Sequence, residues 1–340
     1  MRTVLYRRYG DAADVLDVET VSAPSDPTEG EVAIRVLTRP VHHGNLLGIA
    51  GRYRSPGDLS EVPAGGRRPG FEGMGIVEAV GPGVTRAHDL KVGDRVTFFP
   101  ALGAWSERLS VPARFVTRLH DRISDETAAQ LHVNPMTALL LMRAASDAGV
   151  TPDKGAIMVT AVGAGVAKLT IALALKKQLT VVGVVRRAQG RDELARLFPG
   201  LPVVVTDQAD WPHAVRLALG ERTVGAAFDC VGGVTAAQAF SMLETGGTMI
   251  CYGDLAGAPM PIPALPFSTR GLRIRGISVG GWGGLSDKQR QQDLKDAMAL
   301  ALERPDLFAV SGTYELAEAR TAAAHVRLTG KSGTVLLTSL

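Results

Sequence analysis

Apolar runs typical of buried strands alternate with amphipathic segments typical of helices from residue 156 to residue 252. The expected strands are 156–161, 180–185, 202–206, 224–229 and 247–252, and the expected helices between them are 165–177, 190–197, 210–219 and 234–243. Such alternation implies right-handed βαβ crossovers around a parallel sheet. The pattern predicts a doubly wound α/β domain, and it restricts the fold more than any other feature of the chain.

The first 120 residues differ, because short strand-like runs are separated by turns and no long helical period occurs. The clearest strand candidates are 32–37, 75–83 and 93–99, the second ending in a turn. Helical signals begin at Ser124, a capping residue followed by two acids. We expect Asn134-Pro135 to end that helix and a second helix to cover 137–148.

A polar helix is expected over 286–303, and 334–338 is expected to be a strand that returns to the first domain. These patterns together predict two domains. The first is β-rich and covers residues 1–122, with 305–340 returning to it. The second is the α/β domain, over 123–304.

A glycine turn, Gly163-Ala164-Gly165-Val166-Ala167, follows the first strand of the α/β domain and opens its first helix. It departs from the full G-x-G-x-x-G spacing, so its context carries the prediction of a dinucleotide site. Gly165 allows the backbone to approach a pyrophosphate, which the helix N-terminus attracts. The next strand ends in Arg186-Arg187, where an NAD site would place an acid. Two guanidiniums favour the 2′-phosphate of NADP, unless they are ordinary surface arginines.

Composition excludes several other classes. A chain of 340 residues, 46% hydrophobic and 21% charged, is long enough for two domains and typical of a soluble α/β protein. No apolar stretch reaches the length of a membrane span and no signal-peptide core follows Met1, so we expect a cytoplasmic location. Two cysteines, Cys230 and Cys251, are too few for a four-thiolate zinc cluster, and a net charge of +3 does not indicate nucleic acid.

An ordered series of motifs runs through nearly the whole chain. In order they are Gly51-Arg52-Tyr53, Gly70–Gly75, Val133–Ala138, Asp229–Gly233, Gly246–Gly253 and Gly276–Trp282. The series resembles the zinc-independent medium-chain dehydrogenase/reductase superfamily, and within it the 2-enoyl thioester reductases and their quinone oxidoreductase relatives. The resemblance implies a GroES-like catalytic domain, a Rossmann domain that binds NADPH and a cleft between the two.

The zinc ligands of this superfamily have no counterpart in the sequence. Phe71 replaces the histidine of the zinc branch, and His42-His43 replace the usual Asn-Pro of the zinc-independent branch. Adjacent histidines point to opposite sides of an extended chain and make a poor chelate. We therefore expect no metal.

The resemblance places Tyr53 at the catalytic tyrosine of the enoyl thioester reductases. In that chemistry hydride attacks the β-carbon of the alkene, charge accumulates on the thioester oxygen, and the α-carbon then needs a proton. A phenol with an ordinary pKa near 10 is neutral at physiological pH and suits the role of donor. The alternative is a tyrosine that only packs in a glycine-rich loop.

The resemblance also implies the remaining site residues. Cofactor contacts are expected at Asn134, Thr137, Gly163, Ala164, Gly165, Val166, Arg186, Arg187, Tyr252, Gly253, Ile277 and Val279. The substrate cleft is expected to include His42, Asn45 and Trp282. The family often has a lysine just before the last strand. That position is Thr334 here, and a cofactor contact from Lys331 is left open.

Three functions are compatible with these residues. The first is NADPH-dependent reduction of a 2-enoyl thioester by an oxidoreductase whose arginines attract the phosphates of coenzyme A or a carrier-protein arm. These arginines are Arg52, Arg54, Arg67 and Arg68, and the alternative for them is a solvated loop. The second is NADPH-dependent reduction of a quinone, alkenal or acrylate. The third is a non-catalytic, crystallin-like or RNA-binding role. The resemblance implies a homodimer, joined through residues 262–282.

Overall fold

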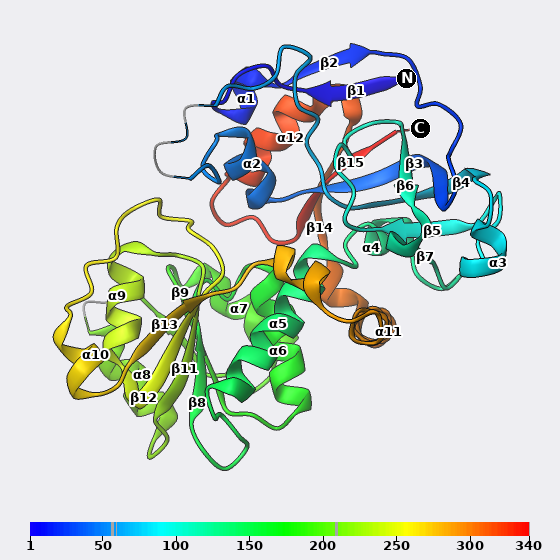
Figure 1. Ribbon diagram of the computed structural model, residues 1–340. Helices are drawn as coiled ribbons and strands as arrows, with labels where there is room; N and C mark the ends of the chain where they lie inside the picture. Colours follow the sequence, from blue (N-terminus) through cyan, green and yellow to red (C-terminus); the bar gives the residue numbers. More distant parts are fainter. Residues whose placement is uncertain (56–57, 59, 208–209, 340) are drawn as a thin grey trace. The chain divides into compact units, whose positions relative to one another are not determined.

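The computed structural model describes residues 1–55, 58, 60–207 and 210–339 (Figure 1). The chain forms two compact units. Unit 1 consists of Met1–Val133 and Asp296–Leu340, and unit 2 of Asn134–Lys295. The chain therefore leaves unit 1 after Val133 and returns to it after Lys295, whereas the sequence placed these divisions at 122/123 and 304/305.

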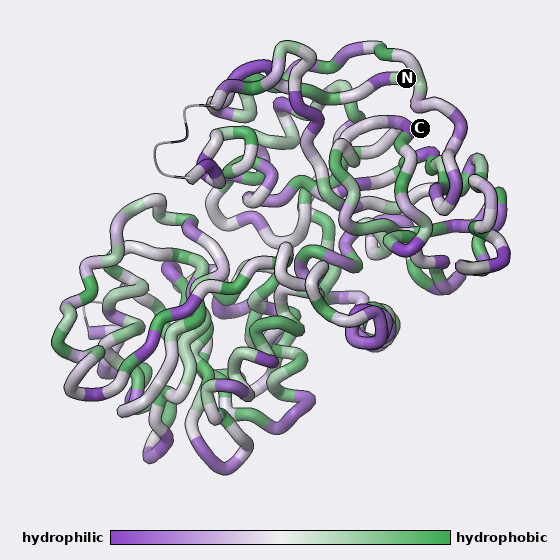
Figure 2. Tube along the Cα trace, viewed as in Figure 1, coloured by the Kyte–Doolittle hydropathy of each residue, from purple (hydrophilic) through white to green (hydrophobic). Residues whose placement is uncertain are grey.

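Unit 2 is built on a six-stranded sheet in the order β10-β9-β8-β11-β12-β13, in which every neighbouring pair is parallel. Its strands are β8 (Ala156–Val159), β9 (Val181–Val185), β10 (Val203–Val205), β11 (Val224–Asp229), β12 (Leu243–Cys251) and β13 (Arg273–Gly276). The central strands are strongly hydrophobic, as expected when helices cover both faces (Figure 2). This is the strand order of a dinucleotide-binding Rossmann sheet, and it confirms the predicted fold class.

Helices cover both faces of that sheet. Those of unit 2 are α5 (Val133–Asp147), α6 (Gly165–Lys176), α7 (Gln189–Leu197), α8 (Trp211–Leu219), α9 (Gly233–Ser241), α10 (Leu265–Thr269), the 3-10 turn η2 (Val279–Gly284) and the first part of α11 (Asp287–Glu303). Trp211 of α8 and Phe240 of α9 pack in one hydrophobic cluster against the strands. Helices α5 and α6 lie on the opposite side (Figure 1).

Unit 1 is built on a seven-stranded sheet in the order β14-β15-β3-β4-β5-β7, with β6 paired to β3. Its strands are β3 (Glu31–Val41), β4 (Gly73–Val80), β5 (Arg95–Phe98), β6 (Arg108–Pro112), β7 (Val116–Arg118), β14 (Val310–Glu315) and β15 (Thr334–Thr338), with β1 (Arg2–Leu5) and β2 (Asp17–Thr20) as a separate pair. Strand β15 pairs antiparallel with β3, so the tail returns to unit 1 as predicted.

Short helices connect the strands of unit 1. They are α1 (Ala12–Val15), α2 (His43–Ile49), α3 (Val84–His88), α4 (Asp125–Ala128) and α12 (Ala319–Val326), with the 3-10 turns η1 (Ala113–Phe115), η3 (Pro305–Phe308) and η4 (Leu316–Glu318). The hydroxyl of Ser124 accepts the N–H of Thr127 at 3.3 Å, which is the cap predicted for α4.

The predicted break at Asn134-Pro135 is wrong. Helix α4 already ends at Ala128, and Asn134 and Pro135 lie inside the first turn of α5. The N–H groups of a first turn have no partner within their helix, so a proline there removes no hydrogen bond. The dipeptide therefore belongs to a helix start, which places Asn134 next to the glycine turn described below.

Candidate active site

The glycine turn of unit 2 connects β8 to α6. Ala164 is the N-cap of α6, and within the described chain no side chain caps this helix. A Cβ on Gly163 would meet no described atom within 4 Å, and one on Gly165 would lie 3.1 Å from the Asn134 amide nitrogen. Open space therefore lies beside Gly163, and the side chain of Asn134 lies beside the first residue of α6. An uncapped helix start of this kind suits an anion.

Arg186 and Arg187 follow β9 directly, and both are exposed. Helix α7 begins two residues later and is held to α6 by Lys168, whose ammonium donates to Glu193 at 2.5 Å. Lys168 is buried and Glu193 is half-buried, so this ion pair joins the two helices with only its carboxylate open to water. The strand end therefore presents two guanidiniums, and no acid, where the sequence predicted a 2′-phosphate contact.

Three further segments meet at the carboxyl edge of the same sheet. The N–H of Tyr252 donates to the carbonyl of Asp229 at 2.9 Å, and the N–H of Ile277 donates to the carbonyl of Cys251 at 2.9 Å. A Cβ on Gly253 would lie 2.9 Å from the Cβ of Cys230, so only glycine fits there. Ligands of open α/β sheets bind at this edge. The structure thus brings the predicted contacts at 163–166, 252–253 and 277 to one side of unit 2.

Asp229, the last residue of β11, bonds to two neighbouring segments at this edge of the sheet. Its carboxylate accepts the Thr160 hydroxyl at 2.7 Å and the Gly232 N–H at 2.8 Å, and it is fully buried. Burial raises the pKa of Asp229 above the ordinary range. The same edge holds Tyr252, whose phenol lies beside Cys230; burial raises its pKa well above 10. Asp229 thus stabilises the turn backbone at Gly232.

Two predicted residues of unit 2 are largely buried. Thr137 on α5 is 7% exposed, and Trp282 in η2 is 2% exposed. The Trp282 indole N–H donates to Asp293 at 2.9 Å. This is a packed, hydrogen-bonded position, and nothing in it favours the predicted role of Trp282 in a substrate cleft, which stays a prediction.

Tyr53 lies in unit 1, in the turn that follows α2, and it is 66% exposed. Its ring folds back on two glycines of α2. A Cβ on Gly44 would lie 3.3 Å from the Tyr53 hydroxyl, and one on Gly48 would lie 3.8 Å from the ring. Partial desolvation raises the pKa of Tyr53 above 10. The phenol is therefore neutral at physiological pH and keeps a proton to donate.

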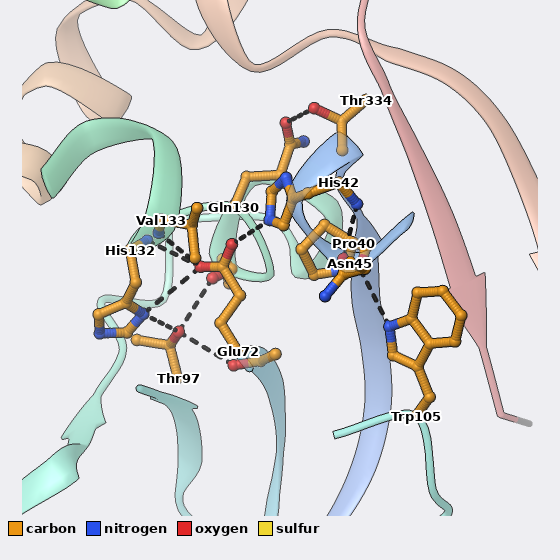
Figure 3. A network of polar contacts seen from close by, with 12 residues as sticks. Pro40, His42, Asn45, Glu72, Thr97, Trp105, Gln130, His132, Val133 and Thr334 are labelled. Carbon is orange, nitrogen blue, oxygen red and sulfur yellow. Dashed lines mark hydrogen bonds and ion pairs between the residues drawn. The ribbon is translucent and has the colours of Figure 1, made fainter. Parts of the chain in front are cut away.

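A buried carboxylate lies behind α2 and was not predicted as a site residue. Glu72, which is 1% exposed, contacts His42 Nε2 at 2.6 Å and accepts the backbone N–H groups of His132 and Val133 at 3.0 Å each (Figure 3). These partners lie 30, 60 and 61 residues away in the sequence, so no local pattern marks them. In the sequence, this segment stood out only because Phe71 replaces the histidine that the zinc branch of the superfamily has there.

Asn45 is predicted in the substrate cleft and is 2% exposed. Its amide oxygen accepts the N–H of His42 at 2.8 Å, which caps the start of α2 (Figure 3). The geometry assumed for the two histidines needs a correction: His42 is extended, with φ −99° and ψ 156°, but His43 is already the first residue of α2. The two histidines therefore do not lie on one extended segment, contrary to the expectation from the sequence.

Among the described residues, no three side chains of His, Cys, Asp or Glu gather as metal ligands would. Within the same residues, no helix is both long and apolar enough to cross a membrane. Lys331, the open cofactor contact, donates to the Gly333 carbonyl at 3.2 Å within unit 1.

Arginines surround Tyr9 near the Tyr53 turn. The Arg54 guanidinium lies 4.6 Å from the centre of the Tyr9 ring, and that of Arg67 lies 5.7 Å from it. Arg54 also donates to the carbonyls of Gly51 and Ser60, which holds it in place. Both arginines are exposed. This arrangement fixes two positive charges on the face of unit 1 that carries Tyr53.

Comparison with known families agrees with the division of the chain into two units. The family described as alcohol dehydrogenase GroES-like domain matches residues 28–121, and the family described as zinc-binding dehydrogenase matches residues 163–303. A mitochondrial enoyl-[acyl-carrier-protein] reductase of Caenorhabditis elegans is 28% identical over 319 residues, which are 92% of this chain and 86% of that protein.

Solved structures extend the similarity to the whole chain. A Bacillus thuringiensis protein with the provisional name NADPH:quinone reductase is 27% identical, with a TM-score of 0.85 over 100% of this chain and 99% of the other. A mycobacterial protein in complex with NADPH is 25% identical, with a TM-score of 0.85 over 100% of both chains.

Proposed function

The chain belongs to the medium-chain dehydrogenase/reductase superfamily, and from this premise we propose that it reduces the activated carbon–carbon double bond of a 2-enoyl thioester. It is an NADPH-dependent oxidoreductase, which sets aside the non-catalytic alternative. The observation that carries the proposal is Tyr53, an exposed and neutral phenol seated on two glycines of α2.

The residues of unit 2 fit NADPH. The uncapped start of α6 would hold the pyrophosphate, with Asn134 beside it, and Arg186 and Arg187 would hold the 2′-phosphate. The open space at Gly163 leaves room for the backbone to approach a phosphate. Bound NADPH supplies the hydride that reaches the β-carbon of the substrate.

Tyr53 completes the reduction. As the β-carbon gains hydride, the electron pair of the double bond moves toward the thioester carbonyl and leaves an enolate. The Tyr53 hydroxyl gives its proton to the α-carbon, and the phenolate regains a proton from water. The pKa of Tyr53, raised by partial desolvation, keeps the donor protonated before each turnover.

The arginines next to Tyr53 suit a thioester that carries phosphate. Arg54 and Arg67, fixed around Tyr9, offer two donors to a phosphate of coenzyme A or of a carrier-protein arm. A quinone needs neither these charges nor a proton donor beside its alkene. The quinone alternative stays open because the solved relatives include a provisional NADPH:quinone reductase.

NADPH oxidation in the presence of crotonyl-CoA and of a simple quinone distinguishes the two substrates. We expect turnover with crotonyl-CoA and a KM that rises when Arg54 and Arg67 are both replaced by alanine. The same double variant should leave the KM of a phosphate-free enoyl thioester unchanged. Turnover of the quinone alone would contradict the proposal.

We also propose a homodimer joined along β13, which is an edge strand of its sheet and so has one unpaired side. Light scattering coupled to gel filtration measures the mass. A monomer across the micromolar range would exclude this interface. A cytoplasmic location stays a prediction.

A further inference from the structure

The segment between β13 and α11 in unit 2 has a composition that favours disorder. It contains Gly280, Gly281, Gly283 and Gly284 and is mostly exposed. A Cβ on the last three would meet no described atom within 4 Å, so packing does not require glycine there. Glycine-rich backbone loses much conformational entropy when it is ordered. The segment nevertheless adjoins Ile277 and Val279, the expected contacts near the nicotinamide.

Trp282 anchors this segment from a buried position, in addition to Arg290, whose guanidinium donates to the carbonyls of residues 283 and 285 at 2.9 and 2.6 Å. Trp282 is 2% exposed, and its indole N–H donates to Asp293 Oδ2 at 2.9 Å. Asp293 lies on α11 and is itself 1% exposed. Its other oxygen, Oδ1, accepts the Arg143 guanidinium of α5. A buried carboxylate requires such partners, and this one uses its two oxygens to join two different elements.

We propose that Asp293 is a positioning residue for the cofactor, which acts by fixing the glycine-rich segment through Trp282. The inference rests on the proposed function only in taking 277–279 and the start of α5 as cofactor contacts. Helix α5 carries Asn134 and Thr137, and η2 begins at Val279. One carboxylate therefore ties together the two segments that carry these contacts. Without the anchor, binding of NADPH would have to order the segment, and this cost would weaken affinity.

Trp282→Phe tests the anchor, because it keeps an aromatic ring and removes only the indole donor. Trp211 offers a matched control in the same unit: it is also 2% exposed and donates its indole N–H to Gln238 at 3.0 Å, from a helix without expected cofactor contacts. In the full-length protein, fluorescence titration should show a Kd for NADPH raised about five- to tenfold by Trp282→Phe and less than about twofold by Trp211→Phe. An equal effect of both substitutions would overturn the proposal.

Asp293 variants separate anchoring from general damage. Asp293→Asn keeps an oxygen that accepts the indole N–H, whereas Asp293→Ala removes it. We expect the Asn variant to stay closer to the wild type in NADPH affinity, and the Ala variant to resemble Trp282→Phe. If the Asn and Ala variants weaken NADPH equally, the hydrogen bond to Trp282 is not the cause and the proposal fails.

Hydrogen exchange of the ligand-free protein gives a second readout. Trp282→Phe should speed exchange in the peptide 277–285, while Trp211→Phe leaves that peptide unchanged. Unchanged exchange in the Trp282 variant would contradict the anchor directly. Neither measurement involves a thioester, so a failure of the proposed substrate would leave both results interpretable.

Discussion

At the scale of single residues, the chemistry depends on how a phenol is held. Tyr53 is 66% exposed, yet its hydroxyl lies against Gly44 in the first turn of α2. That helix start is in turn capped by Asn45 and backed by the contact between His42 and Glu72. The phenol is therefore exposed to solvent on one side and lies against α2 on the other.

Replacing Tyr53 by phenylalanine removes the proton donor and keeps the ring on α2. The kcat for crotonyl-CoA should fall by about 100-fold or more, because a positioned general acid contributes at least this much. The Kd for NADPH should not change. Steady-state kinetics and fluorescence titration measure the two quantities. Tyr314→Phe, which removes a phenol bonded to His325 in the same unit, is the control, and equal losses in both variants would disprove the assignment.

Arg186 and Arg187 permit a second substitution test at this scale. Their joint replacement by alanine should raise the Kd for NADPH by about tenfold or more and leave the Kd for NADH unchanged, because only NADPH carries the 2′-phosphate. Arg191→Ala removes another exposed charge, in the first turn of α7, and should have little effect. A loss of affinity for both nucleotides alike would show that the two arginines do not read the phosphate.

At the scale of elements, the sequence predicted those helices and strands whose formation depends on residues close together in the chain. Five of the six parallel strands of unit 2 were predicted from apolar runs, and each lies within a few residues of its expected bounds. The sixth, β13, contains two arginines and is largely exposed, and the sequence pattern did not predict it. Asn134-Pro135 was wrongly predicted to end a helix, because a proline is compatible with the residue after a helix and with the first turn of one. Glu72 was missed because its partners come from α2 and from the start of α5, and only tertiary structure brings them together.

Helix α2 is the element on which Tyr53 is seated, and its two glycines permit a matched pair of variants. A Cβ on Gly44 would meet the Tyr53 hydroxyl at 3.3 Å, whereas one on Gly48 would meet the ring at 3.8 Å, an ordinary contact. Both substitutions should gain up to about 1 kcal/mol of helix propensity. We expect Gly44→Ala to lower kcat several-fold and Gly48→Ala to leave it near the wild type. Steady-state kinetics and thermal unfolding test this. Equal kcat values for the two variants would show that the contact with Gly44 does not position the Tyr53 hydroxyl.

At the scale of the whole molecule, the chain passes between its two units after Val133 and again after Lys295. The first passage is held by Glu72, which accepts the N–H groups of the last two residues of unit 1 before the chain leaves it. His132 is 1% exposed, stacks on Phe99 with ring centres 5.6 Å apart, and contacts the Thr97 hydroxyl at 3.2 Å. The last residues of unit 1 before this passage are thereby fixed to its core through a buried imidazole.

That imidazole makes the stability of the whole chain depend on pH. Burial lowers the pKa of His132 from 6.5 to about 4, so between these values the unfolded chain binds a proton that the folded chain excludes. The contribution is complete above pH 6.5 and is lost as the pH falls toward 4; the difference corresponds to roughly 3 kcal/mol. Urea unfolding at pH 7, 6 and 5 should therefore show a steep fall in the free energy of unfolding for the wild type.

His132→Gln isolates this term, because it removes the titrating group and leaves a side chain that can still bond to Thr97. His43, whose pKa is also lowered, is present in both proteins and contributes equally to both curves. We expect the variant to be less stable at pH 7, since packing against Phe99 is lost, but to lose less stability on acidification. The two proteins should converge near pH 5. Parallel curves from pH 7 to pH 5 would mean that His132 accepts a proton in the folded state as readily as in the unfolded chain, and that the Glu72 carboxylate offsets its burial.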